Sequence, residues 1–310
     1  MRIVFCGTPD FALPSLRAVA REFEVVGVFT QPDRVNGKRV IEPPVKTEAL
    51  KLGLKVYQCA NISKDGFDDL VSLNPDCIVT CAFGHFLYRK VLALPKYGVI
   101  NVHGSLLPEF RGASPVQSTV LAGKKESGVT IMRTAFEMDS GDILLVEKTP
   151  IGENETAGEL FDRLSVIGAD ALVKGLKLIE SGKAEFVPQD HTKATFCEKF
   201  TKEYGKIDFN KTPDELKRFV LGLNPWPSAY TYLPDGKLFK IHKLLTSNTE
   251  YDCPVGTVVY SDSTHGIVVS CKGGSVILTE VQEEGGRKMD ANSFVLGHNL
   301  KGIVLCSDKK

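Results

Sequence analysis

Runs of apolar residues alternate with amphipathic segments along the first part of the chain. The strand-like runs occupy residues 2–6, 24–29, 55–58, 77–82 and 98–103. Helical patterns separate them at 9–23, 63–73 and 88–94, and a further short helix ends at 49–53. Ser63 is the expected N-cap of the 63–73 helix. Strands that are apolar at nearly every position and alternate with helices predict a Rossmann-like, mostly parallel α/β sheet with helices on both faces. Sites in such sheets lie beyond the carboxyl ends of the strands.

The pattern changes in the second half of the chain. Strand-like runs at 127–134 and 142–148 precede a long amphipathic helix at 156–181, and a polar stretch follows from 183 to 206. Thr212 and Glu215 form a capping box that opens a helix ending near Asn224. Short strand-like runs with Gly-rich turns follow at 229–233, 237–244, 256–260, 266–270, 275–281 and 302–306. Their spacing predicts a small C-terminal antiparallel β-barrel of the OB type.

These changes of pattern predict the domain organisation. A length of 310 residues suits two domains. We expect an α/β domain at 1–189, a linker at 190–206 and a β-barrel domain at 207–310.

The net charge and the lengths of the apolar runs exclude several classes of protein. Lys and Arg number 38, Asp and Glu also number 38, and hydrophobic residues make up 43% of the chain. The basic field of a general nucleic-acid binder is therefore absent, and any such binding depends on local patches. No apolar run is long enough to span a membrane, and the N-terminal run is too short for a signal peptide. We expect a cytoplasmic protein that makes no membrane contact and is a monomer.

The cysteine pattern is typical of free thiols in a reducing compartment. The chain has eight cysteines and no C-x-x-C motif. Cys77 and Cys81 are four residues apart, so we expect them to face the same side of a strand.

Several common sites are excluded by motif. The turn after the first strand has one glycine, Gly7, where a dinucleotide fingerprint needs G-x-G-x-x-G, and no P-loop occurs. Ser105 lacks the G-x-S-x-G elbow of a hydrolase nucleophile. One histidine with hard oxygen ligands is a poor zinc site, so we expect no metal.

Asn101 and His103 stand two residues apart at the end of a strand-like run. Period-2 geometry points both side chains to one face. A pair of satisfied polar residues closing a loop is one interpretation. The other is an oxyanion site, in which the Asn amide and a protonated His donate to an oxygen that becomes negative during acyl transfer. Asp139 could orient the imidazole or move its proton, and Asp142 competes for that role on sequence alone.

At these residues the sequence resembles the folate-dependent formyltransferases. Residues 101–108 (NVHGSLLP) followed by Arg111-Gly112 match the family's N-x-H-x-S-L-L-P…R-G block, and 139–142 (DSGD) match its D-x-G-D block. Residues 81–87 (CAFGHFL) are similar to the loop that lines the family's folate pocket. The likeness extends through the whole chain, including the second domain.

The resemblance implies the chemistry and the residues that perform it. It implies transfer of the formyl group of 10-formyltetrahydrofolate, a co-substrate, with Asn101, His103 and Asp139 as catalytic residues. Asn101 and His103 would bind the formyl oxygen, and Asp139 would position the imidazole and assist proton loss from the attacking amine. The folate-binding residues implied are Phe83, Gly84, His85, Phe86, Leu87, Ser105, Leu106, Leu107, Pro108 and Asp142.

Three further blocks are similar to the members of the family that formylate methionine on initiator tRNA. They are 5–12 (FCGTPDFA), 31–46 and 224–229 (NPWPSA). The implied partner is initiator methionyl-tRNA, and the 31–46 loop is shorter than is usual in the family. The implied tRNA-binding residues are Arg34, Lys38, Arg39, Lys46, Lys237, Lys240 and Lys243. Period 2 puts Lys237 and Lys243 on one face of a strand and Lys240 on the other, unless a bulge intervenes.

Other functions remain open at this point. An amino-sugar nucleotide N-formyltransferase would share Asn101, His103 and Asp139 and a similar C-terminal barrel. A 10-formyltetrahydrofolate hydrolase would share the Asn-x-His core and use water as acceptor. A catalytically inactive tRNA-binding module would have no use for an amide, an imidazole and a carboxylate together.

Overall fold

The computed structural model describes residues 1–37 and 39–305 of the chain. These residues form two compact units. The first contains Met1–Pro115, Glu126–Pro150 and Leu160–Glu198, and the second contains Val116–Lys125, Ile151–Glu159 and the chain from Lys199 onward.

The first unit is built on a seven-stranded sheet with the order β10-β9-β7-β6-β1-β2-β5. The strands β1, β2, β5, β6 and β7 are parallel, whereas β9 runs antiparallel to β7, and β10 antiparallel to β9. The mostly parallel sheet predicted from the apolar runs is therefore confirmed. Its strands are β1 (Arg2–Gly7), β2 (Glu24–Thr30), β5 (Val56–Gln58), β6 (Cys77–Cys81), β7 (Val99–His103), β9 (Glu126–Arg133) and β10 (Ile143–Pro150).

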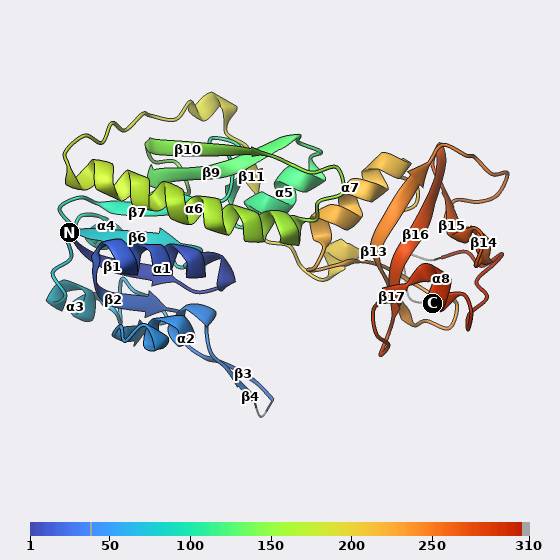
Figure 1. Cartoon of the computed structure of the whole chain (residues 1–310), viewed down its shortest axis with the longest axis horizontal. Helices are drawn as coiled ribbons and strands as arrows, with labels where there is room; N and C mark the ends of the chain where they lie inside the picture. The colour runs from blue at the N-terminus through green and yellow to red at the C-terminus, as the bar shows by residue number, and fades with distance from the viewer. Residues whose placement is uncertain (38, 306–310) are drawn as a thin grey trace. The chain divides into compact units, whose positions relative to one another are not determined.

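Helices cover both faces of this sheet. On one face lie α1 (Leu13–Glu22), which follows the short η1 (Asp10–Ala12), and the long α6 (Ala157–Glu180) (Figure 1). On the other face α3 (Phe67–Ser72) and α4 (Arg89–Leu92) pack against β1 and β6 through one apolar cluster. The helix α2 (Pro44–Lys51) precedes β5.

Alternation along β6 assigns its side chains to the two faces. The Cys81 thiol contacts Ser15 on α1, while Ile78 belongs to the cluster under α3 and α4. Cys77 and Cys81 face the same side by strand periodicity, and Thr80 faces the side of Ile78.

The helix predicted from Ser63 begins later than expected. The N-cap of α3 is Gly66, and no side chain caps it. Ser63 is instead buried, and its hydroxyl accepts a hydrogen bond from the Tyr88 amide at 3.1 Å. The N-cap prediction was wrong because this serine satisfies a backbone group distant in the sequence, which a local pattern does not reveal.

The second unit contains a mainly antiparallel sheet with the order β12-β13-β16-β15-β14, and β17 pairs with β16. The capping box at Thr212 and Glu215 opens α7 (Pro213–Leu223), as predicted. The core packs Phe239, Ile241 and Leu278 of the sheet against Leu216 of α7. The other elements are α5 (Pro115–Leu121), β12 (Ala229–Tyr232), β13 (Leu238–Ser247), β14 (Val258–Asp262), β15 (Gly266–Cys271), β16 (Gly274–Glu283), β17 (Met289–Asp290) and α8 (Ala291–Phe294).

The last strand-like run, 302–306, is represented by a single bridge. Val304 pairs with Thr257, and Cys306 lies outside the described residues. The strand order of this unit confirms the C-terminal antiparallel sheet that was predicted from the short strand-like runs.

A bulge in β13 changes the faces predicted for its lysines. Lys240 lies opposite Gln282 and Lys243 lies opposite Glu280 on β16, with irregular register between Ile241 and Leu244. Because Gln282 and Glu280 are two apart, Lys240 and Lys243 share one face. The exception predicted for a bulge therefore applies: the extra residue shifts the alternation by one, and Lys240 does not face away from Lys243.

Shorter elements complete the described chain. An exposed hairpin joins β3 (Arg34–Asn36) to β4 (Arg39–Ile41), and β8 (Arg111–Gly112) pairs in parallel with β11 (Phe196–Cys197). Two 3₁₀ turns, η2 (His191–Lys193) and η3 (Glu203–Gly205), lie in the polar stretch predicted to be a linker. None of the helices in residues 1–37 and 39–305 has the length and apolar character needed to cross a membrane.

Candidate active site

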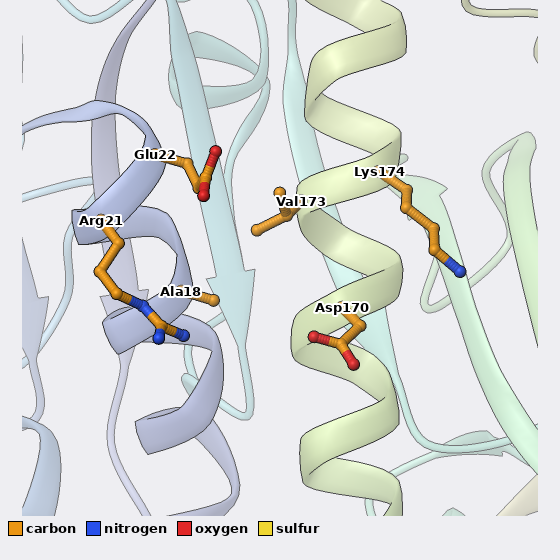
Figure 2. A pocket seen from close by; sticks show the side chains of 6 residues that line it. All are labelled: Ala18, Arg21, Glu22, Asp170, Val173 and Lys174. Atoms are coloured by element: carbon orange, nitrogen blue, oxygen red, sulfur yellow. The ribbon is translucent and has the colours of Figure 1, made fainter.

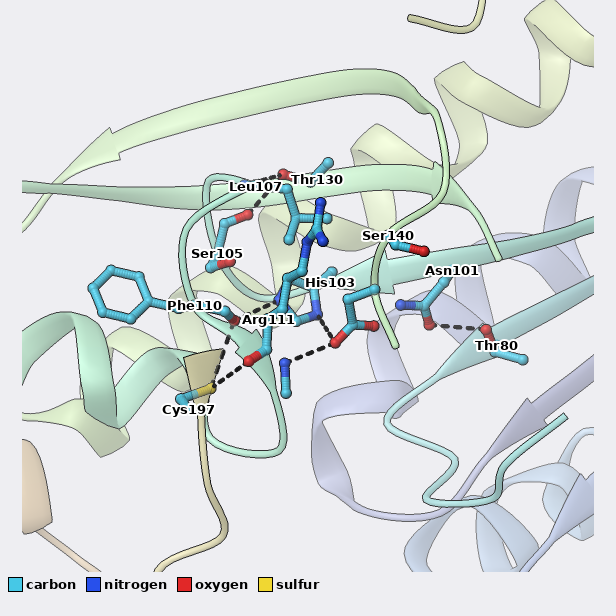
Figure 3. Close-up of polar contacts among 12 residues, drawn as sticks. Thr80, Asn101, His103, Ser105, Leu107, Phe110, Arg111, Thr130, Ser140 and Cys197 are labelled. Atoms are coloured by element: carbon cyan, nitrogen blue, oxygen red, sulfur yellow. Dashed lines mark hydrogen bonds and ion pairs between the residues drawn. The ribbon is translucent and has the colours of Figure 1, made fainter. Parts of the chain in front are cut away.

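Polar side chains gather where β6 and β7 approach their carboxyl ends. Thr80 of β6 is the register partner of Asn101 of β7, and His103 follows on the same face of β7. Figure 3 shows the Asn101 side chain between Thr80 on its right and His103 on its left. The parallel sheet therefore fixes the spacing of these side chains through its backbone.

The Asn101 amide is held in one orientation. Its Oδ1 accepts a hydrogen bond from the Thr80 hydroxyl at 2.8 Å. The amide nitrogen points away from Thr80 and toward His103 (Figure 3). No acceptor among the described residues binds that nitrogen at hydrogen-bond distance, so Asn101 presents an unused N–H donor to the mouth of the site.

His103 is almost fully buried, and its two ring nitrogens have different surroundings. Nε2 lies 3.0 Å from the backbone carbonyl oxygen of Phe110. A carbonyl only accepts, so Nε2 carries a proton. Nδ1 lies 3.7 Å from Oδ2 of Asp139, which is beyond a direct hydrogen bond. Nδ1 is therefore the nitrogen that faces the carboxylate.

Asp139 occupies a tight turn that the backbone of another segment supports. Its φ is +49°, and its Oδ2 accepts a hydrogen bond from the Gly112 amide at 2.8 Å. Gln189 donates to the backbone carbonyls of Asp139 at 2.9 Å and Gly141 at 2.7 Å. Of the two carboxylates that the sequence left in competition, Asp139 is the one in ion-pair range of His103.

The buried side chains of Arg111 and Gln189 support the turn that carries Asp139. Arg111 donates to Oε1 of Gln189 through Nη2 at 2.6 Å and through Nε at 3.2 Å, and Nη2 lies 3.0 Å from Nδ1 of His191. Both Arg111 and Gln189 are buried. Nε and Nη2 of Arg111 therefore have hydrogen-bond partners, as buried polar groups usually do.

Sequence reasoning missed Thr80, Gln189 and the strand β11. Gln189 stands at the end of the predicted α/β domain, in a polar stretch that resembles solvated chain. The Phe110 amide donates to the Thr195 hydroxyl at 2.8 Å, so this stretch is hydrogen-bonded to the segment after His103. A partner about 80 residues away leaves no local signal. Thr80 did leave one, as a hydroxyl in an otherwise apolar strand.

The loop at 82–87 lies beside the strand ends and is held by two neighbours. The carbonyl of Phe83 accepts from the Thr8 hydroxyl at 3.1 Å and from the Gln31 amide at 3.2 Å. Phe83 and Leu87 are buried in the apolar cluster, and Gly84 adopts a φ of +76° between them.

The same loop offers groups that suit a flat heterocyclic ligand. Burial lowers the pKa of His85, which keeps its ring neutral near pH 7, and its Nδ1 is buried without a hydrogen-bond partner. Phe86 is half exposed, and its ring packs edge-on against Tyr88 and Phe136. An unpaired buried nitrogen beside exposed rings fits a ligand that carries both ring faces and polar edges.

Ser105 and Thr130 also hold the segment after His103, in addition to its bonds to the stretch around Thr195. The Ser105 hydroxyl donates to the Glu109 carbonyl at 2.7 Å, and Ser105 is fully buried. The Thr130 hydroxyl donates to the Ser105 carbonyl at 2.7 Å and accepts from the Leu107 amide at 3.2 Å. Leu106, Pro108 and Asp142 are half-buried. The Ser105 side chain thus shapes the loop.

The basic residues expected at a tRNA surface differ in their partners. Lys46 pairs with Asp33 at 2.7 Å and Glu42 at 2.8 Å, which raises the pKa of Lys46. Arg34 donates to Gln31, Arg39 is exposed on the β3–β4 hairpin, and Lys38 lies outside the described residues. In the second unit, Lys237 pairs with Asp235 and Glu283, Lys240 is half-buried and Lys243 is exposed.

A groove of about 310 Å³ lies between α1 and α6 (Figure 2). Thr80 and Asn101 face the other side of the sheet, because their neighbours Cys81 and Val102 face α1 and α6. The charged residues that line the groove are of both signs, with Arg21 and Lys174 beside Glu22 and Asp170. Because both signs are present, the lining does not favour a ligand of either charge. No cluster of three His, Cys, Asp or Glu side chains able to hold a metal occurs in the part of the chain that the structure describes.

Family models match both parts of the chain. Residues 1–176 match the formyl transferase model, and residues 199–299 match the formyl transferase C-terminal domain model. A methionyl-tRNA formyltransferase of Lachnospira eligens is 42% identical over 318 residues, covering 99% of this chain and 100% of the relative. A methionyl-tRNA formyltransferase of Bacillus cytotoxicus is also 42% identical and covers 99% of each chain.

Solved structures share the fold at low sequence identity. HypX from Aquifex aeolicus in complex with tetrahydrofolic acid has a TM-score of 0.63 at 16% identity, covering 96% of this chain and 47% of HypX. An N-formyltransferase from Helicobacter canadensis in complex with folinic acid and dTDP-3-aminofucose has a TM-score of 0.67 at 18% identity, covering 91% of this chain and 98% of that one.

Proposed function

The chain belongs to the formyl transferase family, and we propose that it transfers the formyl group of 10-formyltetrahydrofolate to the α-amino group of methionine on initiator tRNA, for translation initiation. The observation that carries this proposal is the placement of an unused Asn101 N–H beside His103, whose Nδ1 faces the Asp139 carboxylate. The names of relatives that cover nearly the whole chain support methionyl-tRNA as the acceptor.

The reaction needs orientation and charge stabilisation and no enzyme nucleophile, because the acceptor amine is itself the nucleophile. The amine attacks the formyl carbon, a C–N bond forms, and the carbonyl oxygen becomes negative. The Asn101 N–H and a protonated Nδ1 of His103 donate to that oxygen. One such donor contributes roughly 3–4 kcal/mol to transition-state stabilisation.

Proton transfer completes the exchange. The attacking nitrogen becomes positively charged and loses its proton to the Asp139 carboxylate. The adduct then collapses, the bond from the formyl carbon to N10 of the folate breaks, and N10 takes up the proton that Asp139 received, which restores the carboxylate. The Gly112 amide holds Asp139 in place, and the Phe110 carbonyl keeps the other imidazole nitrogen protonated.

The remaining assignments follow from the same proposal. The co-substrate lies against the 82–87 loop, the 105–108 segment and Asp142, where the His85 nitrogen and the Phe86 ring are available. The acceptor RNA contacts Arg34, Lys38, Arg39 and Lys46 of the first unit and Lys237, Lys240 and Lys243 of the second. We assign catalysis and the RNA contacts of the 31–46 loop to residues 1–189, and the remaining RNA contacts to 207–310. The two are joined by 190–206 in a monomeric cytoplasmic enzyme.

A comparison of acceptors tests this proposal. The protein is incubated with 10-formyltetrahydrofolate labelled in the formyl group and either charged initiator tRNA, a set of amino-sugar nucleotides, or no acceptor. We expect label on methionyl-tRNA and none on the sugars. Label on a sugar nucleotide, or release of formate at the same rate without an acceptor, would contradict the proposed acceptor.

A further inference from the structure

The strand β6 carries one hydroxyl at the point where it reaches the site. Its other residues are Cys77, Ile78, Val79 and Cys81, and all five are buried. Thr80 is 6% exposed, and its Oγ1 lies 2.8 Å from Oδ1 of Asn101. Valine has nearly the same shape and suits a buried strand as well, so packing alone does not account for the hydroxyl.

We propose that Thr80 is a positioning residue for the formyl transfer proposed above: its hydroxyl bond to Oδ1 holds the Asn101 amide with the N–H donors facing the substrate. The inference rests on the proposed function. Thr80 acts through Asn101, since its own hydroxyl is buried and directed at the amide oxygen.

The direction of the bond follows from the groups around the threonine. The hydroxyl has one proton and two acceptors within reach, the Asn101 oxygen at 2.8 Å and the Ile100 carbonyl at 3.4 Å. The shorter contact lies at the ideal O–H···O distance, and the longer one does not. The proton therefore goes to Asn101.

The orientation matters because an amide has two different ends. If the Asn101 side chain turned by half a rotation, its oxygen would face the developing negative charge and repel it. Catalysis by charge stabilisation requires donors that are already oriented before the charge appears. Because Thr80 and Asn101 are register partners in the sheet, the Asn101 amide is oriented before the charge appears.

Substitutions that keep shape or keep the hydroxyl separate this role from a structural one. Thr80→Val removes the hydroxyl with little change of volume, and Thr80→Ser retains it. Thr149→Val is the matched control, because Thr149 is a buried strand threonine on β10 whose hydroxyl contacts Arg163. Each variant is assayed with 10-formyltetrahydrofolate and charged initiator tRNA.

We expect Thr80→Val to lower kcat roughly five- to tenfold, the equivalent of one hydrogen bond, with both KM values unchanged. Thr80→Ser should recover most of the loss, and Thr149→Val should leave kcat at the wild-type value. In an Asn101→Ala background, Thr80→Val should cause no further loss, because the group that it orients is gone.

Two results would overturn the inference. One is a Thr80→Val enzyme with wild-type kcat. The other is an equal loss from Thr80→Val in the presence and absence of the Asn101 amide, which indicates a general effect on the fold. A wild-type protein that transfers no formyl group to methionyl-tRNA would contradict the proposed function itself, and wild-type transfer with a neutral Thr80→Val contradicts only this inference.

Discussion

The Nδ1 atom of His103 lies 3.7 Å from Oδ2 of Asp139, and that carboxylate oxygen also accepts a hydrogen bond from the Gly112 amide. The carboxylate thus has a fixed position and a neighbour that can exchange a proton. A small displacement would bring the two side chains into direct contact when a substrate is bound.

Asp139→Asn should remove the charge while keeping the turn. An amide oxygen can still accept from the Gly112 amide, so the local fold is retained. We expect kcat to fall roughly 10²- to 10⁴-fold, the usual range for loss of a general acid–base group. The measurement is single-turnover formyl transfer with saturating substrates.

Asp142→Asn is the control for that variant. Asp142 is placed with the co-substrate, so its substitution should raise the KM for 10-formyltetrahydrofolate more than it lowers kcat. A larger loss of kcat from Asp142→Asn than from Asp139→Asn would reverse the assignment.

Gly112→Ala should displace the backbone amide that binds the Asp139 carboxylate. Gly112 has a φ of +123°, and an added Cβ would lie 2.1 Å from the Cys197 carbonyl oxygen. The backbone must move, and the amide that holds Asp139 moves with it. We expect a loss of about 1–3 kcal/mol in the free energy of unfolding, typical of a strained backbone position, and a lower kcat.

Gly182→Ala isolates the cost of the unusual φ. Gly182 also has a positive φ, +71°, and an added Cβ would meet nothing within 4 Å. Urea unfolding of the two variants gives the comparison. Equal destabilisation with unchanged kcat in Gly112→Ala would argue against a role for this amide in holding Asp139.

Buried thiols should resist alkylation in the native protein. Burial raises the pKa of Cys77 and of Cys81 to about 12, so almost no thiolate forms at pH 8. Cys197 and Cys253 are half-buried. Iodoacetamide labelling followed by mass spectrometry should modify Cys197 and Cys253 before Cys77 and Cys81, and modification of Cys81 at the rate of Cys253 would contradict the buried arrangement.

The second unit should lose stability in mild acid. Burial lowers the pKa of His242 below its ordinary value of 6.5, and its Nε2 lies 3.0 Å from Oε1 of Gln282. Below about pH 6.5 the unfolded chain binds a proton that the folded chain still refuses, so the free energy of unfolding falls as the pH falls. Above about pH 6.5, His242 has no effect on the pH dependence of the free energy of unfolding.

His242→Gln should flatten this dependence. Urea titrations of the wild type and the variant between pH 7.5 and pH 5.5 measure the slope. An identical slope in both proteins would mean that His242 gains its proton equally in the folded and unfolded states.

Much of the fold could be predicted from the sequence because its signals are local. The apolar strands of the parallel sheet and the Thr212–Glu215 capping box each depend on neighbouring residues, and the structure contains them. Asn101 and His103 were found for the same reason, since two polar residues in period 2 at a strand end stand out.

The rest depends on contacts between distant segments. Ser63 binds the Tyr88 amide rather than capping a helix, and Gln189 fastens a turn 50 residues before it. The bulge in β13 moves Lys243 to the face of Lys240 through its pairing with β16. None of these partners is encoded by the composition or periodicity of its own segment.

Single-turnover formyl transfer by Asn101→Ala tests the central claim most directly. The account predicts a rate that falls by roughly 10²- to 10³-fold, as for loss of one oxyanion donor, with the Kd for initiator methionyl-tRNA essentially unchanged. A single-turnover rate equal to that of the wild type, with all substrates saturating, would contradict the assignment of the Asn101 amide to the formyl oxygen.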